Sequence, residues 1–204
     1  MGSTDAARQA EATRADILRH AEELFIHYGF WKTSVGDIAT CCGMSPGNLY
    51  RYFRNKRAIG LAVVGRFLEM SEAAMAGGSI LPTDTPESRI RIIIETGVGH
   101  LVNEMSQNPK IVELVDFLCG DEEGIALLHR HIAWKRDRIA RELGRGIEQG
   151  LFRDADPQKT AATILMATKV FWMPPALAQW REKDTILPEL SEVLDLVFDG
   201  LKVQ

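Results

Sequence analysis

The side chains best suited to chemistry in this 204-residue sequence gather just after Ser45. If a helix begins there, the residues with binding potential that face outward or lie on its flanks are Pro46, Gly47, Asn48, Tyr50, Arg51, Tyr52 and Arg54. An asparagine amide can bond the edge of adenine bidentately, and an arginine can bind guanine or phosphate. Tyrosine hydroxyls and the backbone N–H groups at a helix N-terminus bind phosphate. The set indicates a surface for nucleic acid, and the alternative is a helical hairpin whose basic face is merely solvated.

Two short helices would hold these side chains in place. The capping-box spacing of Ser34 and Asp37 predicts a helix over residues 35–42. Ser45 is a favourable N-cap, and the proline after it suits the first helical position, so a second helix is expected over residues 46–53.

The turn between these two helices has the residue types that a steep helix crossing needs. Gly43 can adopt the left-handed backbone conformation, and the small side chain of Ala39 lets the helices approach each other. The apolar positions that the helices would bury are Val35, Ile38, Cys42, Met44, Leu49 and Phe53. The arrangement is typical of a helix-turn-helix.

Charge is distributed unevenly along the chain, whose formal net charge is −4. Residues 1–66 hold nine Lys and Arg and six Asp and Glu, a balance of +3. The rest of the chain holds 15 basic and 22 acidic residues, a balance of −7. No acidic residue lies between Asp37 and Glu69. A small basic head on an acidic body favours a local site for a polyanion.

The remainder of the chain repeats the helical period and lacks strand alternation. Further helices are expected over about 17–28, 56–75, 87–107, 109–119, 122–149, 157–173 and 186–202. The predicted fold is all-α, with a three-helix helix-turn-helix head, a larger helical body, and nine or so helices in total. We assign residues 1–60 to the head and residues 61–204 to the body, with the helix at 56–75 as a shared connector.

Several classes of protein are disfavoured. No apolar run approaches the ~20 residues of a transmembrane helix, and the polar N-terminus does not resemble a secretory signal. Three cysteines form no disulfide framework, which favours a reduced, cytoplasmic chain. No catalytic, metal or cofactor site satisfies the spacing that its chemistry needs, which counts against the rival interpretation of a helical enzyme.

Two minor alternatives concern residues in the head. Cys41 and Cys42 could form a redox sensor, although inert packing of Cys42 and a surface thiol at Cys41 is the simpler interpretation. His20, Glu23 and His27 share one helix face and could bind a metal, although their spacing is also ordinary surface patterning.

Two stretches of the sequence, Phe30 to Ala39 and Gly43 to Lys56, resemble the DNA-binding head of the TetR family of bacterial transcriptional regulators. The likeness extends over residues 17–66, about a quarter of the chain, with Met44 where the family usually has Val or Ile. The resemblance implies a homodimer whose heads occupy successive major grooves of a double-stranded DNA operator. It also implies that residues 1–60 bind the DNA and that residues 61–204 form an effector-binding and dimerisation domain. When this domain binds a small effector, the protein leaves the DNA. We therefore expect a repressor that uses no cofactor.

The resemblance assigns DNA contacts by position. The base-facing residues would be Pro46, Gly47, Asn48 and Arg51. The phosphate-contacting residues would be Thr33, Tyr50, Tyr52 and Lys56. Ser45, at the start of the second helix, completes the expected contact set. Because Lys56 also stands at the N-terminus of the next helix, beside the recognition helix, its position suits a phosphate clamp.

The body contains bulky apolar residues that outline a possible effector pocket. They are Met105, Phe117, Trp134, Met166, Phe171 and Trp172. Such a lining, with His100 and His129 as the polar candidates, favours an apolar or aromatic ligand over a sugar phosphate. Core packing is the alternative for each of these residues, and a DNA binder without an effector is the corresponding alternative function.

The last predicted helix has a broad apolar face. Its members are Leu187, Leu190, Val193, Leu194, Val197, Phe198 and Leu201. A face of this width could be buried within one subunit. The family resemblance instead implies that the last two predicted helices, 157–173 and 186–202, form a four-helix bundle between two subunits.

Overall fold

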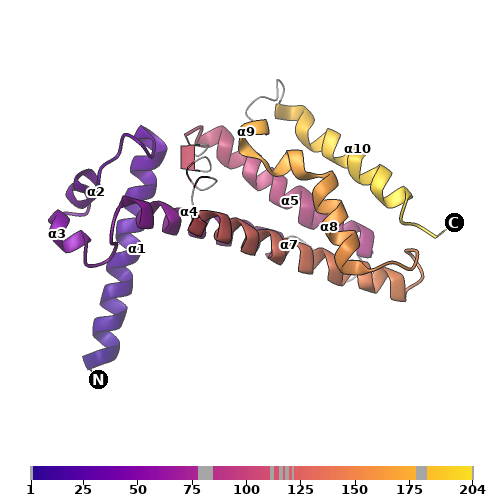
Figure 1. Ribbon diagram of the computed structural model, residues 1–204, viewed down its shortest axis with the longest axis horizontal. Coiled ribbons are helices and arrows are strands. Elements are labelled where there is room, and N and C mark those ends of the chain that lie inside the picture. The colour runs from indigo at the N-terminus through magenta and orange to yellow at the C-terminus, as the bar shows by residue number, and fades with distance from the viewer. Residues whose placement is uncertain are drawn as a thin grey trace. The chain divides into compact units, whose positions relative to one another are not determined.

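The computed structural model describes residues 2–77, 85–110, 113–114, 117, 120, 122–177 and 183–203. Within these residues the secondary structure is helical, apart from an isolated antiparallel bridge between Phe152 and Lys202. The α-helices are α1 (Gly2–Tyr28), α2 (Val35–Cys41), α3 (Pro46–Leu49), α4 (Lys56–Gly77), α5 (Pro86–Gln107), α7 (Glu122–Glu148), α8 (Pro157–Ala167), α9 (Pro174–Leu177) and α10 (Ile186–Asp199) (Figure 1). Short 3₁₀ helices span Lys169–Trp172 (η1) and Lys183–Thr185 (η2). The all-α prediction is confirmed.

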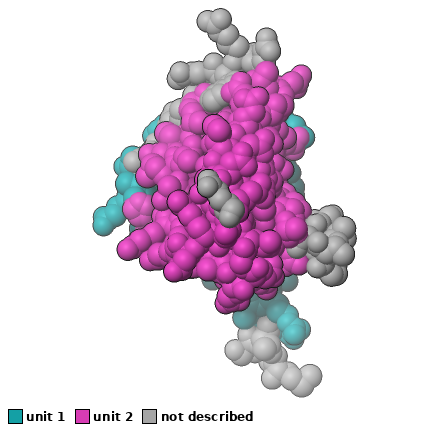
Figure 2. Space-filling model, turned by 90° about the vertical axis from the view of Figure 1, so that its right-hand side faces the viewer, with its two compact units in different colours: residues 1–67, 107–125 teal, residues 68–106, 126–204 magenta. Residues whose placement is uncertain are grey.

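The chain divides into two compact units (Figure 2). The first comprises residues 1–67 and 107–125, and the second comprises residues 68–106 and 126–204. The division falls within α4, the helix expected to connect head and body, but the first unit also takes residues from the middle of the chain. The assignment of DNA binding to residues 1–60 and of effector binding to residues 61–204 stays a prediction.

The first unit is built around α1. Its residues Ile17, Ala21 and Phe25 recur at helical spacing and are almost fully buried. The helix ends as the sequence predicts, because Gly29 follows it with a φ of +91° and its N–H donates to the carbonyl of Phe25.

The second unit contains the C-terminal part of α4, together with α5, α7, α8, η1, α9 and α10. Its core includes Ile94 of α5, Ile139 of α7, Ile164 of α8 and Leu194 of α10, each at most 1% exposed. α5 is tied to α10 by Arg91, whose guanidinium lies 2.6 Å from Asp195.

The predicted helix over 157–173 is interrupted, which corrects that expectation. α8 ends at Ala167, and the chain continues as η1. The cause is Thr168, whose hydroxyl donates to the carbonyl of Ile164 and accepts from the indole N–H of Trp172. A threonine bonded to the preceding turn competes with continued α-helix. The helix expected over 109–119 falls largely outside the described residues.

α10 ends at Asp199, earlier than the predicted residue 202. The next residues turn back so that the N–H of Arg153 donates to the carbonyl of Leu201. Among the helices that the structure describes, none combines the length and the apolar character that crossing a bilayer requires.

Candidate DNA-binding surface and ligand pocket

The helix-turn-helix has the local geometry that the sequence predicts. The N–H of Ser34 donates to the carboxylate of Asp37 over 2.8 Å, and the N–H of Asp37 donates to the Ser34 hydroxyl oxygen over 3.1 Å. Hydrogen bonds from the Ser34 side chain and backbone lower the pKa of Asp37. Gly43 has a φ of +63°, and Ala39 is fully buried. These residues fix the start of α2 and the turn that follows it.

α3 begins as expected but ends sooner. The hydroxyl oxygen of Ser45 accepts from the N–H of Asn48 over 3.2 Å, and the regular helix ends at Leu49 rather than near Phe53. Beyond Leu49 the N–H groups of Arg51 and Tyr52 donate three residues back, so the chain tightens into turns.

Arg14 of α1 holds the end of this segment. Its guanidinium donates to the carbonyl of Tyr52 over 3.2 Å and lies 4.1 Å from the centre of the Phe53 ring. The segment 46–53 is therefore capped by Ser45 at its start and anchored to α1 at its end.

The residues expected to face bases lie largely on the surface. Pro46, Gly47 and Arg51 are exposed, and Asn48 is half-buried. Leu49 is fully buried and forms the inner side of the helix. Tyr50 is 51% exposed, and Tyr52 is half-buried. Residues 46–52, which comprise α3 and the turns after it, thus present Asn48, Tyr50 and Arg51 on a fixed support, which is the arrangement that base reading requires.

Thr33 and Lys56 occupy different positions from the other predicted contacts. Thr33 is buried, and its hydroxyl donates to the carbonyl of Gly29 over 2.9 Å. The Lys56 ammonium donates to the carbonyls of Phe30 and Thr33 over 2.9 Å and to that of Trp31 over 3.4 Å. Burial lowers the pKa of Lys56. In this structure both side chains hold the loop between α1 and α2, and neither offers a free group to phosphate.

Glu123 changes the charge of the basic segment. Its carboxylate lies 2.7 Å from the guanidinium of Arg54 and 3.6 Å from that of Arg57. Sequence reasoning missed this residue because Glu123 lies far along the chain. The basic patch is consequently weaker around Arg54 than the acid-free stretch suggests.

A cluster of possible metal ligands also lies in the first unit. One ligand atom each from Asp16, His20 and Cys42 lie within 4.8 Å of one another. Arg19, however, already contacts two of them, with its guanidinium 2.6 Å from Asp16 and 2.8 Å from the His20 ring nitrogen. Burial is the main cause that raises the pKa of Cys42, which reduces its thiolate fraction. The cluster therefore carries no argument for a metal.

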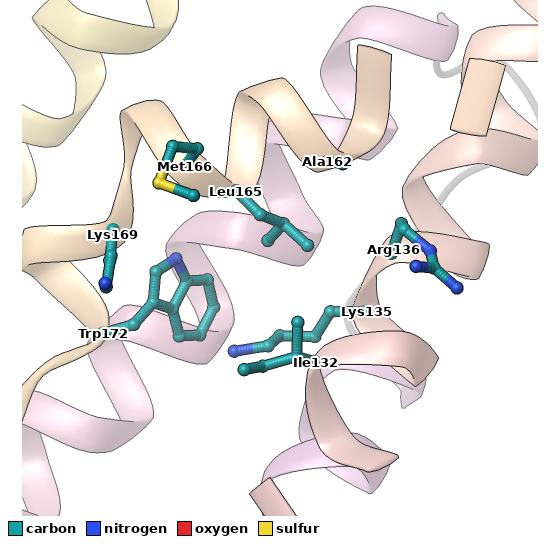
Figure 3. Close-up of a pocket in the computed structure, with 8 residues that line it drawn as sticks. All are labelled: Ile132, Lys135, Arg136, Ala162, Leu165, Met166, Lys169 and Trp172. Atoms are coloured by element: carbon teal, nitrogen blue, oxygen red, sulfur yellow. The ribbon is translucent and has the colours of Figure 1, made fainter. Parts of the chain in front are cut away.

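The second unit contains a pocket of about 320 Å³ between α7, α8 and η1 (Figure 3). The residues that line it are Ile132, Lys135, Arg136, Ala162, Leu165, Met166, Lys169 and Trp172. Two of these, Met166 and Trp172, belong to the set predicted from the sequence.

The other four predicted pocket residues lie elsewhere. Phe171 is buried in the core, and Met105 lies half-buried on α5. Trp134 stacks on the ring of His131 with 6.5 Å between ring centres. Phe117 belongs to the first unit, where its ring centre lies 4.4 Å from that of Phe30. The pocket between α7, α8 and η1 thus includes two of the six residues, and a ligand role for the other four stays a prediction.

Lys135 lines this pocket, and the sequence alone does not predict that its side chain points inward. Its side chain is 5% exposed, and its ammonium nitrogen lies 3.6 Å from the centre of the Trp172 ring. Burial lowers the pKa of Lys135 to about 7, although the charge of Glu72 acts in the opposite direction. Spacing along α7 puts Ile132, Lys135 and Arg136 on one face, but periodicity alone does not say which neighbour that face meets.

The Trp172 ring has its position because Gly97 of α5 leaves room for it. A β-carbon at Gly97 would lie 2.6 Å from the indole and 2.7 Å from the sulfur of Met75. Trp172, which lines the pocket, therefore packs directly against Gly97 of α5. A larger residue at position 97 would displace the ring.

The geometry defines a helix-turn-helix DNA-binding protein whose second, helical unit carries a small pocket. The comparisons with known proteins agree. The family model described as bacterial regulatory proteins, tetR family, matches residues 17–63, and that described as tetracyclin repressor-like, C-terminal domain, matches residues 86–193. The chain belongs to the TetR family of bacterial DNA-binding transcriptional regulators, as the sequence motifs indicate.

Several relatives show the extent of the likeness. The HTH-type transcriptional repressor SCO4008 of Streptomyces coelicolor is 26% identical over 97% of this chain and 93% of its own length. The HTH-type transcriptional regulator UidR of Escherichia coli is 38% identical over 68 residues, which span about a third of either protein. SmeT, the repressor of the Stenotrophomonas maltophilia multidrug efflux pump SmeDEF, is 23% identical over 96% of this chain and 93% of its own, with a TM-score of 0.67. SmeT has also been solved in complex with triclosan.

Proposed function

We propose that this protein is a transcriptional repressor that binds its operator as a homodimer and leaves it when a small ligand with an apolar body fills the pocket of the second unit. The observation that carries the proposal is the exposed side of α3, fixed by Ser45 and Arg14 and matched by the family assignment. SCO4008 and SmeT, which resemble this chain over nearly its whole length, are both named as repressors.

The proposed DNA contacts fall into two groups, those to bases in the major groove and those to the phosphates. Pro46, Gly47, Asn48 and Arg51 face the bases, and Tyr50 and Tyr52 reach the phosphates beside them. Ser45 holds the N-terminus of α3, because its hydroxyl oxygen accepts from the N–H of Asn48. Thr33 and Lys56 act indirectly, by holding the loop that positions α2.

Exposed apolar side chains support a dimer through α8 and α10. Leu196 is 77% exposed and Leu187 is 42% exposed on α10, while Met166 is 68% exposed on α8. By contrast, Phe198 is fully buried within the subunit and takes no part in a contact between subunits. Of the predicted apolar face, Leu190 and Leu194 also belong to the subunit core.

The pocket supports regulation by a ligand. Its hydrocarbon wall and its volume of about 320 Å³ suit a compact apolar molecule. Ligand binding lowers DNA affinity only if the ligand binds the DNA-free conformation more tightly than the DNA-bound one. The complex of SmeT with triclosan shows that a repressor of this fold accommodates an aromatic compound. Since its operator is bacterial DNA, we place the protein in the cytoplasm.

Selection of DNA from a random library by the purified protein tests this proposal. We expect enrichment of one sequence with two related half-sites, bound by two subunits, since a dimer presents two copies of α3. A screen of small aromatic compounds against that complex should then find ligands that release the DNA. Enrichment of no sequence would contradict the proposal, and release by no compound would favour a DNA binder without an effector.

A further inference from the structure

The pocket holds a buried lysine, Lys135, that has no direct carboxylate partner. The side chain of Lys135 is 5% exposed. Within the described part of the chain its ammonium makes neither a hydrogen bond nor an ion pair, since the influences on its pKa are burial and the more distant charge of Glu72. Its close partner is the face of Trp172, 3.6 Å away. An aromatic face stabilises a cation but accepts no conventional hydrogen bond, so the ammonium protons still lack acceptors.

The one carboxylate that acts on Lys135 is already engaged elsewhere. Glu72 of α4 lies 2.8 Å from the ring nitrogen of His131 and forms no ion pair with Lys135. The other charged groups that line the pocket, Arg136 and Lys169, are both basic, and Asp137 lies 3.7 Å from the guanidinium of Arg136. The described pocket lining therefore contains basic and no acidic side chains, whereas the protein as a whole has a net charge of −4.

The positive groups differ in direction. Figure 3 shows the ammonium of Lys135 directed toward Trp172, between that ring and Ile132, whereas the guanidinium of Arg136 is directed away from the Trp172 ring. The rest of the wall is hydrocarbon, from Ile132, Ala162 and Leu165. One inward ammonium in an apolar wall suits a ligand with one anionic group and a flat apolar body.

We infer that the pocket binds a small aromatic monocarboxylic acid, whose carboxylate accepts a hydrogen bond from Lys135 and whose ring lies against Trp172 and Leu165. The inference rests on the proposed function, which makes this pocket the effector site, and it names the chemical class of the effector. A neutral aromatic compound would leave the buried ammonium without an acceptor. A phosphate dianion would need several buried donors, whereas Lys135 is the one basic residue of the described lining that is almost fully buried.

This assignment makes binding depend on pH in a specific direction. Because the pKa of Lys135 is about 7 in the free protein, part of the population must take up a proton when a carboxylate binds. The groups that face Lys135 are Glu72 and His131, with Arg136 and Lys169 at the pocket. Burial and the charge of Lys135 lower the pKa of His131, so His131 stays largely neutral above pH 7. Affinity for the carboxylate should therefore fall about tenfold for each pH unit above 7.

Calorimetric titration of the full-length protein with 2-naphthoate and with its uncharged analogue 2-naphthamide tests the inference. At pH 6.5 we expect the acid to bind at least about 30-fold more tightly than the amide, and at pH 8.5 the advantage should be about 25-fold smaller, because the protonated fraction of Lys135 falls by that factor. Lys135→Met should abolish the advantage and leave amide binding intact. Arg141→Met, which removes one positive charge from an exposed position of the same helix, should preserve it.

Each other outcome is decisive. Equal affinity for acid and amide in the wild type, or a preference for the acid that survives Lys135→Met, would overturn the inference and leave the pocket as an apolar effector site. Binding of neither compound would overturn the pocket itself. Operator binding, measured on the same samples without ligand, reports separately on the proposed DNA-binding function.

Discussion

Replacement of Lys56 by methionine separates two roles that the same residue could have in a DNA-binding head. In the structure its ammonium donates to the carbonyls of Phe30 and Thr33 over 2.9 Å and to that of Trp31 over 3.4 Å. It also lies 4.6 Å from the centre of the Phe30 ring. Lys56→Met keeps the apolar stem of the side chain and removes all of these interactions, so the loop before α2 should lose its support.

The contacts set the size of the effect. A hydrogen bond from a charged donor contributes about 1.5–3 kcal/mol to stability. When the donor is removed, a buried carbonyl acceptor that is left without a partner destabilises the folded state. Lys56 is half-buried, so water can reach part of the freed carbonyl surface. We therefore count the two short bonds at the lower end of this range and expect the free energy of unfolding to fall by about 2–4 kcal/mol.

Urea-induced unfolding followed by circular dichroism measures this loss. The matched control is Lys32→Met, which removes the same charge from an exposed side chain near the same loop and should change stability by no more than about 0.5 kcal/mol. If Lys56→Met unfolds like the control while the salt dependence of DNA binding falls by about one unit, Lys56 contacts phosphate and the structural role is refuted.

Three further predictions follow from the second unit. Leu196→Asp, at a position that is 77% exposed, should give folded monomers in sedimentation velocity, whereas Phe198→Asp, at a fully buried position, should reduce helicity in circular dichroism; a Leu196→Asp protein that stays dimeric would place the interface elsewhere. Gly97→Ala should destabilise the protein by about 1–3 kcal/mol and weaken ligand binding, since its β-carbon would meet Trp172, whereas Gly99→Ala, with open space, should be tolerated; equal melting temperatures for the two variants would contradict this. The pKa of Lys135 is about 7 in the folded protein and ordinary in the unfolded chain, so the unfolded chain holds this proton more tightly. In urea titrations the free energy of unfolding of the wild type, relative to that of Lys135→Met, should therefore rise by about 2 kcal/mol from pH 7 to pH 9. If the difference between the two proteins does not change with pH, Lys135 is not a buried lysine with a lowered pKa.

The features that the sequence predicts well are those set by neighbouring residues. The capping box of Ser34 and Asp37, the cap at Ser45 and the left-handed conformation of Gly43 each depend on groups within about four positions. Local hydrogen bonding and steric preference decide such features, so they are visible before any tertiary structure forms.

The features that were missed depend on residues far apart along the chain. Lys56 finds carbonyls 23 to 26 residues away, and Arg54 finds Glu123 from 69 residues away. The bulky, apolar side chain of Phe117 predicts a place in the effector pocket, whereas in the structure its ring packs on Phe30. Helical periodicity says which residues share a face, whereas the neighbour of that face is decided by packing, and that is why Lys135 could not be placed.

The central claim is that the exposed side of α3 reads the operator sequence. The most direct test measures the binding free energies of the wild type, Asn48→Ala and Arg51→Ala on the selected operator and on a scrambled duplex at one salt concentration. We expect either variant to lose about 1–3 kcal/mol of binding free energy on the operator and much less on the scrambled DNA. Equal losses on both duplexes, or no loss on the operator, would contradict it.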